Sequence, residues 1–220
     1  MKAGHRFTKD EIRRAMELYA VTDRRWLKPG QTLTEAVREA LKGGATFVQL
    51  REKEMDAAGI EAEAGELKQL CGEFGVPFVI DDAVDIAVRA GADGVHVGQE
   101  DMEAGRARTL LGGDAIVGVS AETVEEAVLA EKNGADYLGV GAVFPTGSKD
   151  DAIPVGFDTL RNICEAVSIP VIAIGGITKD NVRKLRGTGI AGIAVISAIF
   201  AQPDIRKAAE ELREHVRQVL

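Results

Sequence analysis

Eight short apolar runs, rich in β-branched residues, alternate with helical patterns along this chain of 220 residues. Runs that are apolar at both alternating positions are typical of parallel strands buried on both faces. We predict strands at about 17–21, 45–50, 76–80, 93–97, 115–119, 136–140, 170–174 and 191–196. We predict helices at about 32–43, 57–74, 83–90, 103–111, 122–133, 157–167, 178–187 and 204–219. Eight strand–helix units in so short a chain favour an α/β fold, a closed (β/α)8 TIM barrel.

A doubly wound open sheet is the alternative architecture, but no G-x-G-x-x-G motif follows the first predicted strand. The length suits one domain of barrel size or two small ones. Because no stretch has the composition of a linker, we predict a single TIM-barrel domain over 1–220. An extra helix at about 8–16, within an N-terminal extension of residues 1–16, is expected to cover the bottom of the barrel.

The net charge of −8 argues against general binding to nucleic acid or to anionic membranes, because both need a basic surface. An anionic small substrate requires positive charge that is local and focused. The N-terminus has no apolar core typical of a signal peptide, and no apolar run reaches the roughly 20 residues of a membrane helix. Cys71 and Cys164 lie far apart in predicted helices, so we expect reduced, packed thiols in a cytoplasmic protein. A homo-oligomer is plausible.

Polar residues follow five of the predicted strands. The segments are VQLREK (48–53), VIDDAVD (79–85), GVHVGQED (94–101), VGAVFPTGSK (140–149) and VIAIGGI (171–177). Folds built from repeated strand–helix units place their active sites at the carboxyl ends of the strands. The sequence therefore predicts that the residues able to do chemistry gather at one end of the barrel.

The second predicted strand ends in two cations that share one side of the strand. Gln49, Arg51 and Lys53 have the same parity, so all three point into the barrel mouth if the first does. Burying unpaired cations is costly, and a phosphate or diphosphate would compensate them. An ion pair with Glu52 or Glu54 is the alternative interpretation.

The third and fourth predicted strands end in acids, at Asp81-Asp82 and Glu100-Asp101. Neighbouring parallel strands lie about 4.8 Å apart, so Asp82 and Asp101 are able to approach one site. Two carboxylates with phosphate oxygens and water suit Mg²⁺. Helix N-caps are the alternative for each acid, since aspartate is favoured there.

Two further residues in or at the ends of the predicted strands each have two alternative roles. His96 lies in the fourth predicted strand and either meets a substrate ring or is a satisfied core residue. Ser120 at the end of the fifth is either a phosphate or substrate contact or the N-cap of the next helix, with Thr123 or Glu122 completing its start.

The sixth predicted strand leads into the longest loop, 141–156, and loops of this length in compact domains are often functional lids. Thr146, Ser148 and Lys149 supply two hydroxyl groups and a cation. Gly147 lets the backbone approach a ligand closely. A solvated loop without a binding role is the alternative.

The seventh and eighth predicted strands end in Gly175-Gly176 and Ile196-Ser197, where TIM barrels frequently bind phosphate through backbone N–H groups. The mouth would then hold two anion sites, which indicates two phosphorylated substrates, one of them a diphosphate. We find no Ser-His-Asp set and no zinc spacing. Transfer with diphosphate as the leaving group needs only charge stabilisation and alignment.

These motifs together closely resemble the thiamine-phosphate synthase family. The matching segments, in the family's order, are YAVTD (19–23), VQLREK, the DD-V-D segment, GVHVGQED, GVSAET (118–123), YLGVGAVFPTGSK (137–149), IAIGGI and VISAI. The resemblance runs from about residue 19 to 200. It implies a (β/α)8 barrel transferase that joins hydroxymethylpyrimidine diphosphate to a thiazole phosphate, giving thiamine phosphate and diphosphate.

The resemblance also implies roles for particular residues. It places Mg²⁺ on Asp82 and Asp101. It places the pyrimidine diphosphate on Gln49, Arg51, Lys53, Ser120 and Lys149, and the thiazole phosphate near Thr146, Ser148, Gly176, Ile196 and Ser197. The implied mechanism is dissociative: diphosphate leaves, and the thiazole nitrogen captures a pyrimidine-stabilised cation. One departure is Asp81, where the family commonly has Asn.

Three other functions fit a barrel of this kind. A thiazole tautomerase-like paralogue and a catalytically silent thiazole-phosphate-binding barrel would share the phosphate site without needing the diphosphate and metal residues. The presence of Lys53, Asp82, Asp101 and Lys149 favours the synthase over both. An unrelated phosphate-binding isomerase would need a base, for which His96 is the one histidine in a predicted strand.

Overall fold

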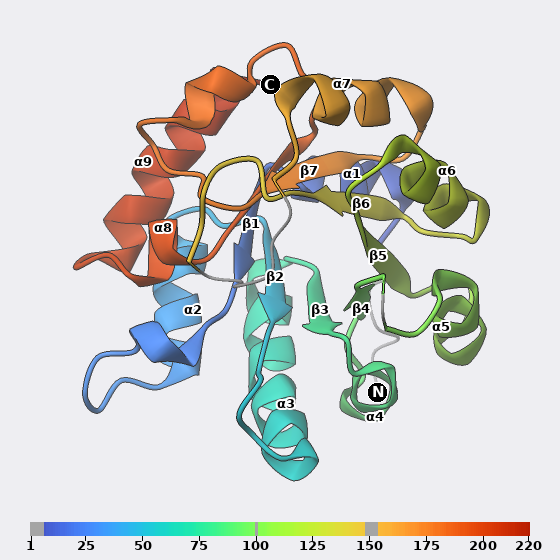
Figure 1. Cartoon of the computed structure of the whole chain (residues 1–220). Helices are drawn as coiled ribbons and strands as arrows, with labels where there is room; N and C mark the ends of the chain where they lie inside the picture. The colour runs from blue at the N-terminus through green and yellow to red at the C-terminus, as the bar shows by residue number, and fades with distance from the viewer. Residues whose placement is uncertain (1–6, 100, 148–153) are drawn as a thin grey trace.

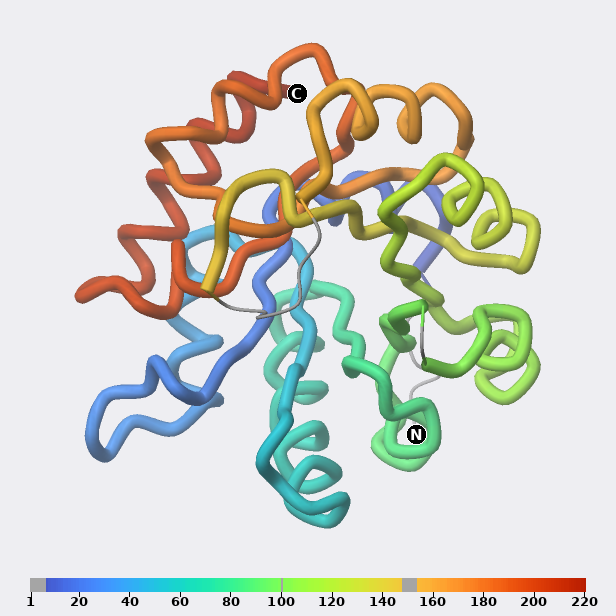
Figure 2. The backbone as a smooth tube through the Cα atoms, viewed as in Figure 1, coloured from blue at the N-terminus to red at the C-terminus, as the bar shows by residue number. Residues whose placement is uncertain are grey.

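The computed structural model describes residues 7–99, 101–147 and 154–220, and its strands close into a parallel barrel in the order of the sequence. The strands are β1 (Leu18–Val21), β2 (Phe47–Leu50), β3 (Phe78–Asp81), β4 (Gly94–Val97), β5 (Ile116–Ala121), β6 (Tyr137–Val140), β7 (Val171–Ile174) and β8 (Gly192–Val195). The ring closes where β8 pairs with β1, which Figure 2 shows as orange-red chain beside blue. The predicted TIM barrel is confirmed, and each predicted strand agrees with the observed one to within two residues at either end.

Helices cover the outside of the ring (Figure 1). In the described ranges they are α1 (Lys9–Ala15), α2 (Leu33–Lys42), α3 (Ala57–Phe74), α4 (Val84–Ala90), α5 (Ala104–Leu111), α6 (Val124–Lys132), α7 (Phe157–Ala166), α8 (Ser197–Phe200) and α9 (Ile205–Arg217), with the 3₁₀ helices η1 (Arg24–Trp26) and η2 (Val182–Leu185). None of the described helices is long and apolar enough to cross a bilayer.

The helix predicted over 178–187 is wrong, because only the 3₁₀ helix η2 forms there. The side chain of Asn181 accepts from the backbone N–H of Thr178 at 2.8 Å and donates to the carbonyl of Gly176 at 2.8 Å. Such local bonds offer the backbone an alternative to an α-helix. Gly187 and Gly189, both at positive φ, then end the segment in a turn.

Several other helices begin or end at residues that local chemistry favours. Thr32 and Glu35 form a capping box at the start of α2, and Asp56 accepts from a backbone N–H at the start of α3. At the carboxyl ends, Gly91 follows α4 at φ 63° and Gly134 follows α6 at φ 90°. Glycine adopts this left-handed conformation without a Cβ penalty, so it turns the chain sharply back into the next strand.

Side chains alternate along each strand between two separate cores. One set, including Leu18 and Ala20 of β1, faces outward into the layer between barrel and helices. The other set, including Tyr19 and Val21, fills the inside of the barrel. Because both faces are buried, the strands have to be apolar throughout, which explains the unbroken apolar runs in the sequence.

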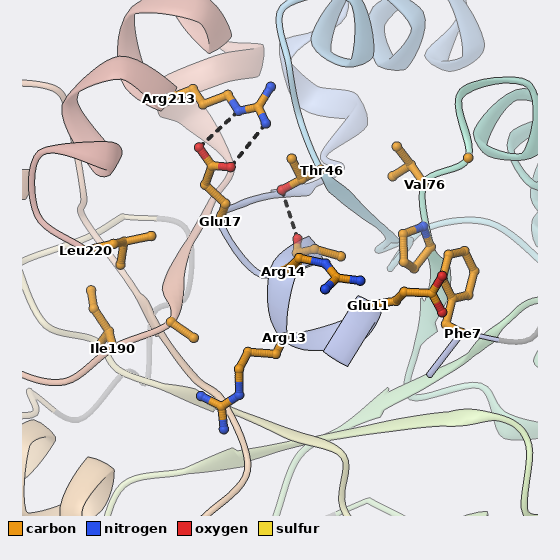
Figure 3. Close-up of a pocket in the computed structure, with 14 residues that line it drawn as sticks. Phe7, Glu11, Arg13, Arg14, Glu17, Thr46, Val76, Ile190, Arg213 and Leu220 are labelled. Atoms are coloured by element: carbon orange, nitrogen blue, oxygen red, sulfur yellow. Dashed lines mark hydrogen bonds and ion pairs between the residues drawn. The ribbon is translucent and has the colours of Figure 1, made fainter. Parts of the chain in front are cut away.

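Helix α1 closes the amino-terminal end of the barrel, as predicted. Its Ile12 and the following Met16 are buried against the inner core. A cavity of about 700 Å³ lies beside α1 at this end (Figure 3). It is bordered by an ion pair between Glu17 and Arg213, with two contacts of 3.1 Å. It lies at the opposite end of the strands from the predicted site, and this face of TIM barrels serves stability.

Two glycines make room for the largest polar side chains inside the barrel. A Cβ on Gly118 of β5 would lie 2.1 Å from the ring of Tyr137, and a Cβ on Gly139 of β6 would lie 3.1 Å from His96. Tyr137 is fully buried and His96 nearly so. The inner layer therefore depends on small residues at these two strand positions.

We predict that Gly118→Ala lowers the free energy of unfolding by about 1–3 kcal/mol, because a buried ring has to move to admit the added methyl group. Urea denaturation followed by circular dichroism measures this loss. Gly65→Ala in α3 is the matched control, because nothing lies within 4 Å of its added Cβ. That variant is expected to keep or slightly raise the stability. Equal unfolding midpoints for wild type and Gly118→Ala would contradict the packing argument.

Candidate active site

The polar end of β2 points into the barrel mouth. Gln49 is buried among the inner side chains, and its amide donates to Oδ1 of Asp81 at 2.5 Å. Arg51 and Lys53 follow with the same parity, and both approach the other oxygen of Asp81. Arg51 Nε lies 3.7 Å from Oδ2, and Lys53 Nζ lies 3.3 Å from it. The structure therefore brings the predicted cations of β2 together with the predicted acids of β3.

Lys53 also lies 2.6 Å from Oδ2 of Asp82, so it sits between two carboxylates. Burial acts to lower the pKa of Lys53, but the hydrogen bond to Asp82 and the charge of Asp81 outweigh it and raise the pKa. At Asp81 burial raises the pKa, against the opposing charges of Lys53 and Arg51. The site is thus a compact cluster of opposite charges at the edge of the mouth.

The alternative ion pair of these cations with Glu52 is wrong. Glu52 pairs instead with Arg24 at 3.1 Å, and Arg24 also binds Glu63 at 2.8 Å. This separate group lies on the outward parity of the strand end. Arg51 and Lys53 are therefore left to the mouth.

Asp82 and Asp101 approach each other as predicted, and neither caps a helix. The N-cap of α4 is Ala83 and that of α5 is Glu103, both without a side-chain cap bond. Burial raises the pKa of Asp101, and a hydrogen bond and charge from Asp82 raise it further. Oδ2 of Asp101 accepts from the backbone N–H of Gly98 at 2.8 Å, which orients it.

The backbone at Asp82 is unusual in itself. Its φ of 59° makes it the one non-glycine residue at positive φ in the described part of the chain. Such conformations are uncommon, and they cluster at functional sites where the surrounding structure holds them. Here the backbone N–H of Asp82 donates to the carbonyl of His96 at 2.8 Å. The strained turn brings the carboxylate toward Lys53 and Asp101.

The inner layer below this cluster contains two tyrosines that sequence reasoning missed. Tyr19 and Tyr137 are fully buried, and their hydroxyl oxygens are 2.7 Å apart. The hydroxyl of Tyr19 donates to Oε1 of Gln49 at 2.8 Å, and that of Tyr137 lies 3.0 Å from Nδ1 of His96. A tyrosine inside an apolar strand needs a polar partner, and that requirement was the signal in the sequence.

His96 and Ser120 are joined as neighbours on β4 and β5. Nε2 of His96 lies 3.0 Å from Oγ of Ser120. Burial lowers the pKa of His96 to about 4, so its ring is neutral at pH 7. The N-cap of α6 is Thr123, whose side chain accepts from the N–H of Glu126, so Ser120 is free of that structural role.

The paired glycines after β7 pack against the loop that follows β6. A Cβ on Gly175 would lie 2.5 Å from Ala142, and one on Gly176 would lie 2.3 Å from the carbonyl of Pro145. Both have positive φ. Thr146 is the next residue of that loop, directly after Pro145. Ser148 and Lys149 lie outside the described residues.

Ile196 and Ser197 follow β8 at the start of the short helix α8. The first N–H groups of a helix have no intrahelical partner and are available to a ligand. Ile196 also contacts the inner core, so it belongs to the mouth of the barrel. The β7 and β8 ends therefore form a second polar region, built mainly from backbone.

The family model described as thiamine monophosphate synthase matches residues 18–199 of the chain. The chain belongs to the thiamine-phosphate synthase family. A thiamine-phosphate synthase of Clostridium tetani is 49% identical over 195 residues, which are 89% of this chain and 93% of that protein. One of Pyrococcus furiosus is 49% identical over 209 residues, which are 95% of this chain and 99% of that protein.

A solved thiamine phosphate pyrophosphorylase from Pyrococcus furiosus superposes with a TM-score of 0.87 at 47% identity, covering 95% of this chain and 99% of that one. The family match spans both polar regions, from Gln49 on β2 to Ser197 after β8. The resemblance found in the sequence motifs is confirmed, and so is the (β/α)8 architecture that it implied.

The buried His96 predicts a pH dependence of stability. Its folded pKa of about 4 lies below the value of about 6.5 for an exposed histidine. Between these values the unfolded chain binds a proton that the folded protein excludes. The contribution of neutral His96 to the free energy of unfolding is therefore complete above about pH 6.5 and is lost as the pH falls toward 4.

Wild type and His96→Asn should accordingly differ in the pH dependence of unfolding. We expect the wild-type advantage in unfolding free energy to shrink by about 3 kcal/mol between pH 7 and pH 4, at about 1.4 kcal/mol per pKa unit. Urea denaturation of both proteins across this range measures the difference. The pH-dependent effects of the carboxyl groups are the same in both proteins, so they cancel in the difference between the two unfolding free energies. A difference independent of pH would show that His96 is not buried in its neutral form.

Proposed function

We propose that this protein is a thiamine-phosphate synthase: a transferase that joins 4-amino-5-hydroxymethyl-2-methylpyrimidine diphosphate to 4-methyl-5-(2-hydroxyethyl)thiazole phosphate, or its carboxylated form. Relatives 49% identical over about nine-tenths of the chain carry this activity in their names. The single observation that carries the proposal is the position of Lys53, which lies between Asp81 and Asp82 at the mouth. A silent phosphate-binding barrel or a tautomerase has no use for this charged cluster.

The donor set at this cluster suits Mg²⁺. Asp82 and Asp101 bring two carboxylates together, and a divalent cation relieves the repulsion between these two like charges. Within the described ranges no group of three or more His, Cys, Asp or Glu side chains is placed to hold a metal alone. The diphosphate would supply the remaining oxygen ligands. When bound, Mg²⁺ would neutralise charge on the leaving diphosphate.

The chain's own residues then hold the diphosphate and the pyrimidine ring. Arg51 and Lys53 supply positive charge at one edge of the mouth, and Lys149, from the loop outside the described residues, is proposed to add to it. The bond from the pyrimidine methylene carbon to the diphosphate oxygen breaks, and both electrons leave with the oxygen. Gln49 and His96 form the polar floor on which the ring lies. No general base is needed, because no proton is removed.

The thiazole phosphate is proposed to bind on the opposite edge. Backbone N–H groups near Gly175, Gly176 and Ser197 suit a phosphate, and Thr146 is proposed to join them because it follows Pro145, whose carbonyl contacts Gly176. Ser148 and Ile196 complete the proposed set. The thiazole nitrogen then forms the new bond to the methylene carbon. Alignment of this nucleophile is the main contribution of the second edge to rate.

We place the reaction in the cytoplasm. Cys71 is buried and Cys164 is partly buried, and both are free thiols. Burial raises the pKa of both thiols, to about 12 for Cys71 and about 11 for Cys164, so neither is a reactive nucleophile. Unpaired thiols are typical of proteins from reducing compartments.

Purified protein with both phosphorylated substrates and Mg²⁺ should release thiamine phosphate and diphosphate in equal amounts. The assay measures both products, with EDTA as the control that removes the metal. Product formation that resists EDTA would contradict the metal proposal. Binding of thiazole phosphate without any product would favour the tautomerase-like or silent barrel.

We predict that Asp101→Asn raises the Mg²⁺ concentration needed for half-maximal activity at least about tenfold, because one anionic ligand is lost. Binding of Mn²⁺ followed by electron paramagnetic resonance, without substrates, should weaken in parallel. Asp85→Asn is the matched control, since this aspartate is exposed on α4 and pairs with Arg89. Equal Mg²⁺ requirements in both variants would show that Asp101 does not bind the metal.

A further inference from the structure

A continuous chain of hydrogen bonds crosses the inside of the barrel, from the acidic cluster on β3 to the hydroxyl on β5. Its members are, in order, Asp81, Gln49, Tyr19, Tyr137, His96 and Ser120. The five donor–acceptor distances lie between 2.5 and 3.0 Å. Within the described residues, no buried polar side-chain atom lacks a hydrogen-bond partner. The direction of each bond in this chain of hydrogen bonds is therefore decided by its neighbouring members.

One end of the chain fixes which atoms donate. Oδ2 of Asp81 forms ion pairs with Lys53 and Arg51 as a carboxylate, and Oδ1 faces Gln49. A carboxylate only accepts hydrogen bonds. Gln49 must therefore present its NH₂ group to Asp81, which leaves its carbonyl oxygen to face Tyr19.

The remaining bonds follow one by one. The single proton of the Tyr19 hydroxyl goes to Gln49, so Tyr19 accepts from Tyr137. The proton of Tyr137 is then used, and its oxygen has to accept from Nδ1–H of His96. His96 is buried, and among the described residues its two ring nitrogens meet only the hydroxyl groups of Tyr137 and Ser120, so no anion contacts either nitrogen to stabilise a charged ring. With Nδ1–H donating to Tyr137, Nε2 keeps its lone pair and accepts from Ser120.

We propose that Asp81 is a positioning residue which, through this chain, holds His96 in the Nδ1–H tautomer and makes Ser120 a hydrogen-bond acceptor toward the mouth. The hydroxyl proton of Ser120 is committed to His96, and only its lone pairs face the ligand. A group that Ser120 recognises must then be a hydrogen-bond donor, either an N–H or an O–H group. This differs from the expectation that Ser120 serves the diphosphate, which only accepts.

The ligand assignment rests on the proposed function. The pyrimidine substrate carries an amino group, which is the kind of donor that an accepting Ser120 would recognise. Gln49 and His96 lie in the same polar layer inside the barrel, so the pyrimidine ring would contact this layer. The donor and acceptor roles in the layer are fixed by Asp81 on β3, two strands from Ser120 on β5. Asp81 itself need not touch the ring.

The tautomer of His96 tests the direction of the chain without any substrate. Nitrogen-15 NMR of histidine distinguishes Nδ1–H from Nε2–H, and the chain has only three histidines, His5, His96 and His215. We expect Nδ1–H for His96 in the wild type at pH 7. In Gln49→Leu the hydroxyl of Tyr19 can donate only to Tyr137, so the remaining bonds reverse and His96 is expected as Nε2–H.

Asp81→Asn is the conservative variant, because asparagine has the same shape but both donates and accepts. It removes the fixed end of the chain, so we expect both tautomers of His96 to be populated. Asp85→Asn, on the exposed face of α4, is the matched control and should keep the wild-type tautomer. Nε2–H in the wild type, or an unchanged His96 signal in both Asp81→Asn and Gln49→Leu, would overturn the proposal.

A substrate pair tests the role of Ser120. We expect the kcat/KM preference for the aminopyrimidine diphosphate over its analogue without the amino group to fall about tenfold in Ser120→Ala, the loss of one hydrogen bond. An unchanged preference would overturn the acceptor role. If neither compound reacts with the wild type, the proposed function fails, while the NMR result still decides the direction of the chain.

Discussion

Closure of β8 onto β1 is the constraint on which the rest of this structure depends. A closed ring of parallel strands has an inside of fixed width, and every second side chain must fill it. Most of these inner positions are apolar. The polar ones are confined to the layers near the carboxyl ends, where they satisfy one another by hydrogen bonds. The site is therefore a property of the ring rather than of any one loop.

Charge in the mouth is balanced locally, although the protein as a whole is strongly acidic. Lys53 and Arg51 share the carboxylate of Asp81, and Lys53 also meets Asp82. A free mouth in this state buries little uncompensated charge. A diphosphate ester and a divalent cation bring charges of opposite sign, so each is able to pair with the residues of opposite charge and most of the added charge is compensated within the mouth.

Much of this arrangement was predictable from the sequence, because strand parity and strand order decide it. The inward position of Gln49 and the meeting of Asp82 with Asp101 follow from parallel strands that are neighbours in the chain. The short η2 helix was not predictable from apolar periodicity, because the side chain of Asn181 competes for the backbone there. The hydrogen bonds of Tyr19 and Tyr137 were also not predictable from the sequence, because their partners lie on strands that are distant in sequence. Helix capping by Asp82 was a real alternative until its backbone conformation was known.

The left-handed backbone of Asp82 limits how evolution or a designer can alter this position. Most side chains are disfavoured at φ 59°, while glycine, asparagine and aspartate tolerate it. In a library that randomises this position, most variants would therefore be lost because they fold less stably, before any loss of the carboxylate could affect activity. Replacements that keep the turn would lose the carboxylate, and a glutamate that keeps the charge would strain the turn. The carboxylate and the left-handed backbone conformation at position 82 therefore cannot be changed independently of each other.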